Sequence, residues 1–449
     1  MLLKPAILST PPVKFGECTR EELREYFLNT WDLYETLKRS INDRSHFYVA
    51  PDPLRHPLIF YLGHTACFYI NKLKASGYLS QGLNSRYESL LAVGVDPESS
   101  DDLEKGINWP EVEDVWAYRD QVRQVVLDYI ENAPLIDSVD MNSSMWALHM
   151  AFEHERIHFE TSSVLMRQYP VEYLTRPDGW EYAPYENLNK PAFEMVSFTG
   201  GEVQLGKPNN FPTYGWDNEY GDLTVRVDPF AIGNLMVTNR EFLEFVNSGG
   251  YQDQSFWTEE GWDWVTEESM AYPKFWIRQD GGEFRYRAMF DILDLPMDWP
   301  AEVTAYEAEA YLKWKGGGLR LMSEAEWKFA TAHAPETNGD PAFCTLHNLS
   351  LAYGSPTPVG HYGNGCTPNG VYDLYGNVWD WLSDDFYPLP GFEVHPWYKD
   401  FSQPYMDDQH GMMAGGSWAS SGTSASKYYR LWFRRGFFQH AGFRVATSL

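Results

Sequence analysis

Two histidines lie four residues apart in residues 153–160, which read EHERIHFE. Successive residues of an α-helix turn by about 100°, so His154 and His158 would lie about 40° apart on one face. Both imidazoles can then reach one metal ion, although such a pair is also found on ordinary helices. His149 would lie off this face, and Glu160 would be placed to support the site from outside.

The same residues also fit the pattern H-E-x-x-H, from His154 to His158. In zinc hydrolases with this pattern the two histidines bind zinc and the glutamate is the general base. A zinc hydrolase with Glu155 as its base is therefore an alternative function.

A third ligand is offered by the segment RHPLIFYLGHTACFY, residues 55–69. It places His64 among apolar and aromatic residues, about two turns into a predicted helix. Helical bundles build metal sites from side chains on facing helices. We therefore predict a metal site formed by His64, His154 and His158.

Four segments with helical periodicity precede residue 180, and they predict a four-helix bundle. Thr19 and Glu22 form a predicted capping box at the first segment, and Pro57 is a favoured first-turn residue at the second. The segments are residues 19–41, 57–73, 110–133 and 142–169. We assign residues 1–180 to this bundle and residues 181–194, which are rich in turn formers, to a linker.

After residue 195 glycine, tryptophan and asparagine become frequent and the apolar runs shorten. Two helices are predicted here, at residues 304–316 and 323–333, the second with a capping box of Ser323 and Glu326. The remainder of residues 195–449 is predicted as short strands and long loops. The expected fold class is therefore α+β.

The composition restricts the possible partners. The chain has 449 residues, 43% of them hydrophobic, and a formal net charge of −28. Binding to nucleic acid or to an anionic membrane needs a basic face, so neither partner is expected. No stretch reaches the roughly 20 apolar residues that span a bilayer, and the N-terminus lacks the features of a signal peptide. We expect a cytoplasmic protein.

The cysteines predict no disulfide framework. Cys18, Cys67, Cys344 and Cys366 form no CxxC pair and are widely spaced. Reduced thiols are the expectation for such a pattern in a reducing compartment.

The histidine motifs GHT and HERIHFE resemble the iron-ligand motifs of the nonhaem iron sulfoxide synthases of thiohistidine biosynthesis, which lie in a DinB-like bundle. The second half resembles the formylglycine-generating-enzyme/sulfatase-modifying domain, which has a C-type-lectin-like fold. The resemblance spans nearly the whole chain. It implies that the three histidines bind Fe(II) and that the enzyme uses O2. The second-half motifs are YGWDNE, VTNREFLEFVNSGGY, GGGLRLMSEAEWKFA, GVYDLYGNVWDW, GGSW and HAGFR.

Within that family the motifs look most like the ovothiol branch, which joins L-cysteine to L-histidine as 5-histidylcysteine sulfoxide. The motifs are RHPLIFYLGHTACFYINKL, EHERIHFETSSVLMRQ and FRRGFFQHAGFR. The ergothioneine branch, which uses hercynine with cysteine or γ-glutamylcysteine, is the alternative, as is a relative that uses a selenium donor. Ovothiol enzymes continue into a methyltransferase domain, whereas this sequence ends at FRVATSL. A separate methyltransferase is therefore expected to act downstream.

The resemblance also assigns roles to residues of the second half. The family places a catalytic tyrosine in the loop after GNVWDW, which reads LSDDFYPLPGF here. Matching YP-x-x-GF selects Tyr387, whereas an alignment on PGF selects Phe386. Substrate carboxylates would be bound by arginines, whose two-pronged fork suits them. The candidates are Arg434 and Arg435, then Arg430, and Arg86 from the bundle.

Two further alternatives concern the second half alone. A formylglycine-generating oxidase needs a cysteine pair after the GGS-aromatic stretch, and the matching positions here are Ser420 and Ala425. A lectin-like binding module without catalytic activity would leave the histidine site unexplained. We therefore expect an enzyme.

Overall fold

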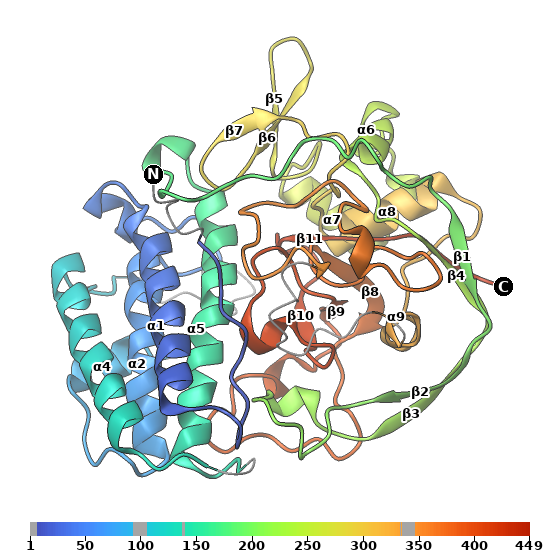
Figure 1. The fold of residues 1–449 in the computed structure, drawn as a ribbon. Helices are drawn as coiled ribbons and strands as arrows, with labels where there is room; N and C mark the ends of the chain where they lie inside the picture. The colour runs from blue at the N-terminus through green and yellow to red at the C-terminus, as the bar shows by residue number, and fades with distance from the viewer. Residues whose placement is uncertain (1–6, 93–105, 137–139, 333, 335–345) are drawn as a thin grey trace. The chain divides into compact units, whose positions relative to one another are not determined.

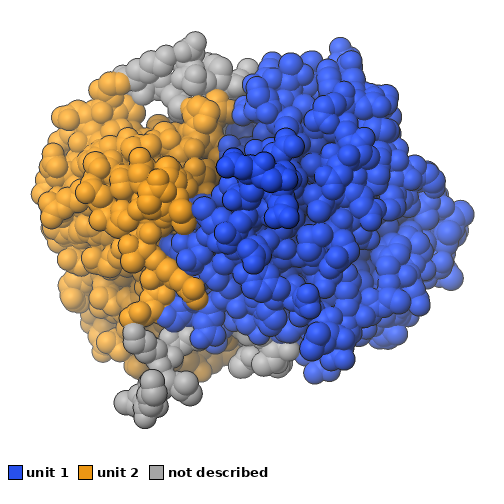
Figure 2. Space-filling model, turned by 90° about the horizontal axis from the view of Figure 1, so that it is seen from above, with its two compact units in different colours: residues 1–8, 179–208, 215–449 blue, residues 9–178, 209–214 orange. Residues whose placement is uncertain are grey.

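The computed structural model describes residues 7–92, 106–136, 140–332, 334 and 346–449 (Figure 1). The chain forms two compact units, which Figure 2 shows in different colours. The helical unit contains residues 9–178 and 209–214. The mixed unit contains residues 179–208 and 215–449, and residues 7 and 8 near the N-terminus also belong to it.

Four long helices lie side by side in the helical unit (Figure 1), which confirms the predicted bundle. The capping box at the first helix is present, since Glu22 N donates to Thr19 Oγ1 and Thr19 N donates to the Glu22 carboxylate. The long helices are α1 (Arg20–Arg39), α2 (Leu58–Ala75), α4 (Val112–Asn132) and α5 (Ser144–Arg167), and α3 (Ser85–Leu90) is a short one.

Aromatic side chains fill the centre of the bundle. The ring of Phe27 lies 5.5 Å from that of Trp31 and 5.8 Å from those of Tyr69 and Phe152, measured between centroids. These four rings come from α1, α2 and α5, and each side chain is fully buried. Such rings bury large apolar areas, and they fix α2 against α5, the two helices that carry the predicted metal ligands.

The described residues of the mixed unit form four small sheets and four α-helices, besides short 3-10 helices. Helices α8 and α9 confirm the two predicted helices, and α6 and α7 are additional. The helices are α6 (Asn239–Asn247), α7 (Glu259–Glu267), α8 (Ala305–Lys315) and α9 (Glu324–Thr331). The sheets, in strand order, are β1 (Met195–Phe198)–β4 (Phe230–Gly233)–β12 (Ala446–Ser448), β2 (Gly201–Leu205)–β3 (Leu223–Val227), β5 (Trp276–Arg278)–β6 (Phe284–Arg287)–β7 (Ile292–Asp294), and β10 (Leu431–Arg434)–β9 (His410–Ala414)–β8 (Trp379–Asp385)–β11 (Ala441–Gly442).

The HAGFR motif near the C-terminus holds several of these segments together. The buried guanidinium of Arg444 donates to Asp380 at 3.0 Å and to the carbonyls of Gly233 and Asp373 at 3.2 and 3.0 Å. A Cβ at position 442 would lie 2.6 Å from the carbonyl oxygen of Ala301, so only glycine fits at this position. The motif therefore stabilises the fold of the mixed unit.

The chain around the predicted boundary between bundle and linker, at residues 180 and 181, contacts residues 354 and 355. Trp180 Nε1 donates to the carbonyl of Gly354 at 3.1 Å, and Ala183 N donates to Ser355 Oγ at 3.0 Å. Residues 1–180 and 195–449 remain our proposal for the two domains.

Two further expectations concern membranes and disulfides. Among the described residues, no helix has the length and apolar character that crossing a membrane requires. Cys18, Cys67 and Cys366 are free thiols. Cys344 lies outside the described residues.

Candidate metal centre and substrate residues

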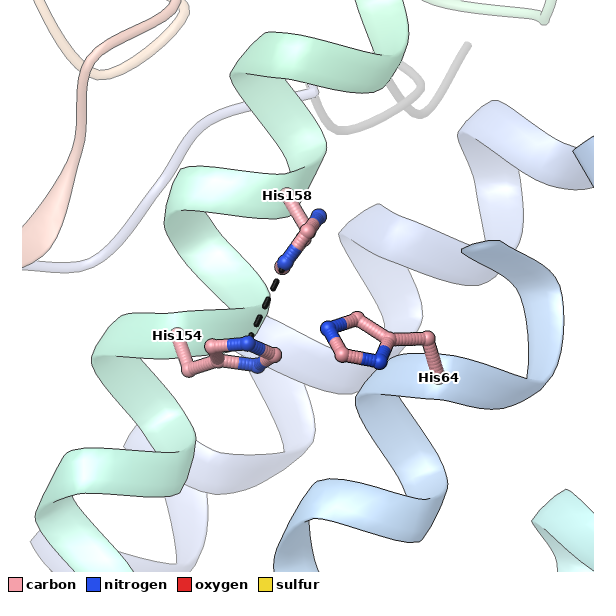
Figure 3. Close-up of side chains that lie close together, drawn as sticks. All are labelled: His64, His154 and His158. Atoms are coloured by element: carbon pink, nitrogen blue, oxygen red, sulfur yellow. Dashed lines mark hydrogen bonds between the residues drawn. The ribbon is translucent and has the colours of Figure 1, made fainter. Parts of the chain in front are cut away.

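The three predicted ligand histidines lie together in the bundle (Figure 3). His64 projects from α2 toward His154 and His158, which occupy successive turns of α5. One ring nitrogen from each residue lies within 4.8 Å of the others, and the Nε2 atoms of His154 and His158 are 3.1 Å apart. Residues about 90 positions apart in the sequence meet here because α2 packs against α5.

The spacing of these nitrogens fits a shared metal ion. Two nitrogens bound at about 2.2 Å, with a right angle between them, lie about 3.1 Å apart. The His154–His158 separation of 3.1 Å matches this value without a rotamer change. Three ligands on one side of an ion leave the opposite positions open for substrates. The donor set therefore fits a catalytic metal.

Burial keeps the three imidazoles in the neutral form that binds metals. The side chains of His64 and His154 are 2% exposed. Burial lowers the pKa of His64 from 6.5 to about 4, and it lowers the pKa values of His154 and His158 well below 6.5. Neutral imidazole has a free lone pair, so no proton has to leave at pH 7 before a metal binds.

The surroundings orient two of the rings. The Nδ1 atom of His64 lies 2.7 Å from the carbonyl oxygen of Leu91, which accepts a hydrogen bond if Nδ1 carries the proton. This tautomer directs the Nε2 lone pair to the ligand position. The ring of His154 stacks on Phe68, with centroids 3.6 Å apart and planes 6° from parallel.

Glu155 does not face this centre as a free base. Its carboxylate accepts hydrogen bonds from Arg119 at 3.0 Å, Tyr69 at 2.9 Å and Thr65 at 3.2 Å, and its side chain is fully buried. A carboxylate that already accepts three donors is poorly placed to take a proton from a metal-bound water. The geometry therefore disfavours the zinc hydrolase alternative.

Tyr387 lies just after β8 in the mixed unit and is half-buried. Its hydroxyl donates to Glu324 Oε2 at 2.7 Å, and the guanidinium of Arg430 lies 4.8 Å from the centre of its ring. Burial, with the charge of Glu324, raises the pKa of the Tyr387 hydroxyl far above 10. The hydroxyl is therefore protonated at neutral pH, as a proton donor must be.

Arg430 makes several internal hydrogen bonds in the mixed unit. Its Nε and Nη2 atoms donate to Glu324 at 2.6 and 3.0 Å, and Nη1 donates to the carbonyls of Asn218 and Tyr387, both at 3.0 Å. The side chain is 5% exposed. The fork is thus occupied by internal acceptors, so its binding of a substrate carboxylate stays a prediction that would require these partners to be exchanged.

The other predicted arginines are more accessible. Arg434 Nη1 donates to Gln409 at 2.7 Å, and Arg435 Nη2 donates to Asp385 at 2.7 Å, both at the end of β10. Arg86 is exposed on α3, where it donates to the carbonyl of Asn108 at 3.1 Å. These surface partners are exchangeable, so a role in carboxylate binding stays a prediction for all three.

The positions that match the cysteine pair of a formylglycine-generating oxidase carry other side chains. Ser420 and Ala425 are buried, and Ser420 Oγ accepts a hydrogen bond from Ser417 N at 2.8 Å. A hydroxyl and a methyl group do not supply the thiol pair of a formylglycine-generating oxidase.

Sequence reasoning missed the partners that hold these residues. Arg119 and Glu324 are buried ionic residues that contact Glu155 and Tyr387 respectively. In the sequence, only the predicted capping box of Ser323 and Glu326 pointed to the residues around Glu324. No motif or spacing pointed to Arg119.

Comparison with known proteins identifies both halves of the chain. Residues 26–162 match the DinB superfamily, and residues 182–449 match the sulfatase-modifying factor enzyme 1-like domain. The hercynine oxygenase of Mycolicibacterium thermoresistibile is 31% identical over 425 residues, which cover 89% of each chain. The hercynine oxygenase of Mycolicibacterium smegmatis is 30% identical over 443 residues, which cover 92% of this chain and 96% of that relative.

A fungal relative extends the match. The ergothioneine biosynthesis protein 1 of Schizosaccharomyces pombe is 24% identical over 468 residues, which cover 93% of this chain and 55% of the fungal protein. The two family matches bear out the expected pairing of a DinB-like bundle with a C-type-lectin-like domain, and the relatives favour the ergothioneine branch over the ovothiol branch. The chain belongs to the hercynine oxygenase family and is an oxidoreductase of the sulfoxide synthase type.

Proposed function

We propose that this chain is an iron(II)- and O2-dependent enzyme that joins the sulfur of cysteine or γ-glutamylcysteine to the imidazole carbon of hercynine. One oxygen atom of O2 enters the product as a sulfoxide. The other leaves as water with the hydrogens of the carbon and of the thiol, so the reaction balances. The hercynine oxygenases at 30 and 31% identity support this acceptor rather than the L-histidine of the ovothiol branch.

The observation that carries the proposal is the convergence of three neutral histidines, His64, His154 and His158, in the bundle. Bound iron(II) would supply coordination positions for the thiolate and for O2, and would activate O2 for C–S bond formation and sulfur oxygenation. The three histidines would bind the other side of the ion and leave these positions open. Holding the reactants together makes their meeting effectively intramolecular.

Residues outside the metal centre are proposed to handle protons and carboxylates: Tyr387, Arg434 and Arg435 of the mixed unit, and Arg86 of the helical unit. Tyr387 would hold a proton on its hydroxyl and donate it during the reaction, with Glu324 fixing its orientation. Arg434 and Arg435, and more weakly Arg86, would bind the carboxylates of the two amino-acid substrates through charge-assisted hydrogen bonds.

The test is O2 uptake by protein loaded with iron(II) under anaerobic conditions, followed by mass spectrometry of the products. Hercynine and L-histidine are supplied separately, each with cysteine or with γ-glutamylcysteine. We expect an adduct of hercynine that carries one added oxygen. An adduct with L-histidine alone would assign the chain to the ovothiol type, and no uptake with either acceptor would overturn the proposal.

Substitution of the ligands tests the metal site itself. His154→Ala and His158→Ala are expected to lose bound iron together with O2 uptake. His46→Ala is the matched control, because His46 lies in the same unit, where it stacks on Tyr173. Iron retained by both ligand variants at the wild-type level would contradict the assignment of the site.

A further inference from the structure

One guanidinium joins all four long helices of the bundle. Arg119 of α4 donates to Glu155 of α5 at 3.0 Å and to Thr65 Oγ1 of α2 at 2.9 Å. On the α1 side its Nε lies 3.5 Å from a carboxylate oxygen of Glu35, and its guanidinium lies 4.1 Å from the ring centre of Trp31. The side chain of Arg119 is fully buried.

Two partners of this guanidinium are the neighbours of metal-ligand candidates in the sequence. Thr65 directly follows His64 on α2, and Glu155 directly follows His154 on α5. Consecutive helical residues point about 100° apart, so the ion pair lies to one side of the histidines but shares their backbone. Thr65 also donates to Glu155 at 3.2 Å, which joins α2 to α5 directly.

Stability alone does not explain a buried pair of this kind. Removing two charges from water costs several kcal/mol per ion, and well-packed apolar side chains at such positions are often equally stable or more stable. The arrangement of Arg119, Glu155 and Thr65 is instead highly directional, with donor–acceptor distances of 2.9–3.2 Å. Such hydrogen bonds specify how far one helix is shifted along another.

The metal centre is sensitive to that shift. One residue of an α-helix spans about 1.5 Å along its axis, whereas metal–ligand distances hold within about 0.2 Å. A small slip of α2 along α5 would therefore move His64 away from His154 and His158. Apolar packing tolerates such slips better than a buried network of hydrogen bonds does.

We propose that Arg119 and Glu155 are positioning residues of the three-histidine centre, which set the register of α2 against α5. This inference rests on the metal site of the proposed function but not on its substrates. The pair touches no ligand atom, so it acts through the backbone that Thr65 and Glu155 share with His64 and His154.

The test is cobalt(II) binding, because Co(II) reports ligand geometry through its visible absorption and needs no O2. The double variant Arg119→Met/Glu155→Met is compared with the wild type. We expect it to fold with an unchanged or higher Tm, to bind Co(II) about 10- to 100-fold more weakly and to show a shifted Co(II) spectrum. Wild-type affinity and spectrum in the folded double variant would overturn the inference.

Further variants separate register from stability. Glu155→Gln alone should be less stable than the double variant, because it leaves a buried guanidinium without its counter-charge. Arg119→Lys keeps the charge but loses the fork, and it should also weaken Co(II) binding. If the double variant does not fold, the Co(II) affinity of Arg119→Lys decides. Wild-type affinity overturns the proposal, whereas weaker Co(II) binding by a variant with wild-type helicity supports it.

Two controls distinguish this inference from the proposed function. Lys207 and Glu219 form another fully buried ion pair, at 3.2 Å in the mixed unit, and their double substitution by methionine should leave the Co(II) spectrum unchanged. A Co(II) spectrum altered by that control to the same degree would show a general effect of buried charges and overturn the proposal. His154→Ala must abolish the Co(II) spectrum. If it does not, the metal site itself is wrong and both proposals fall, whereas loss of O2 chemistry alone leaves the inference standing.

Discussion

The hydroxyl of Tyr387 donates a 2.7 Å hydrogen bond to Oε2 of Glu324, the carboxylate that Arg430 also binds. The charge of Glu324 and the burial of the ring both raise the pKa of the Tyr387 hydroxyl. Arg430 donates to both oxygens of this carboxylate, which fixes its position beside the tyrosine hydroxyl. The three side chains form one network in which the tyrosine is a fixed, neutral donor.

Tyr387→Phe removes only the hydroxyl of this network. We expect the variant to fold and to bind iron, and its yield of sulfoxide adduct to fall about 100-fold relative to simple oxidation of cysteine, because positioned proton donors contribute about that factor or more. Mass spectrometry of the two products measures the ratio. Tyr372→Phe, in the same unit, is the control. An unchanged ratio in Tyr387→Phe would remove the hydroxyl from the reaction.

Glu324→Gln should damage the fold rather than the chemistry alone. The change leaves the 5% exposed guanidinium of Arg430 without its counter-charge. Breaking a buried ion pair by removing one partner costs about 3–5 kcal/mol in the free energy of unfolding. Urea titration of the unfolding transition checks this value, and the double variant Glu324→Gln/Arg430→Met should recover part of the loss. A loss below about 1 kcal/mol would contradict a buried pair.

Lys38 is expected to destabilise the bundle at neutral pH. Its side chain is fully buried on α1, and its Nζ has no hydrogen-bond partner among the described residues. Burial lowers the pKa of this amine well below 10.5. The unfolded chain therefore binds the proton more tightly than the folded chain, and the contribution of this group to stability falls as the pH drops below about 10.5.

Lys38→Met should consequently raise the free energy of unfolding at pH 7 by about 1–3 kcal/mol. The gain should shrink as the pH approaches 10, where the unfolded chain also begins to lose the proton. Urea titrations at pH 7 and pH 10 measure both values. Equal effects of Lys38→Met at both pH values would refute the assignment.

The bundle and the grouping of its three histidines could be predicted because their signals are local. Helical periodicity and the Thr19–Glu22 capping box act within a few residues, and the spacing of His154 and His158 is a property of one helix. His64 required only the further assumption that an apolar helix packs against its neighbour. Helix α6 carries the same kind of local signal, since Thr238 and Glu241 form a capping box at its start.

The networks around the site could not be predicted, because their partners are distant in sequence. Arg119 meets Glu155 across 36 residues, and Arg430 meets Glu324 across 106. An arginine in a helical pattern is most often a surface residue, and only the packed structure shows that its fork is occupied. The sequence around Arg430 likewise carries no sign that its guanidinium donates to the carbonyls of Asn218 and Tyr387.

The buried side chain of His149 should make the helical unit less stable at acidic pH. Its ring lies 4.5 Å from Phe15 and 5.5 Å from Phe152, and it is 2% exposed. Burial lowers its pKa from 6.5 to about 3. The unfolded chain binds a proton near pH 6.5, but the folded chain does so only near pH 3. The stability from this residue is therefore complete above pH 6.5 and is lost progressively as the pH falls toward 3.

Between pH 7 and pH 4.5 this loss amounts to about 3 kcal/mol in the free energy of unfolding. His149→Phe removes the titrating group and keeps an aromatic ring between its neighbours, so its stability should fall less steeply over this range. Urea titrations of the metal-free protein at both pH values give the two slopes. The three ligand histidines titrate in both proteins, so the difference between the slopes isolates His149. Parallel slopes would mean that His149 binds its proton equally well in the folded and unfolded chains.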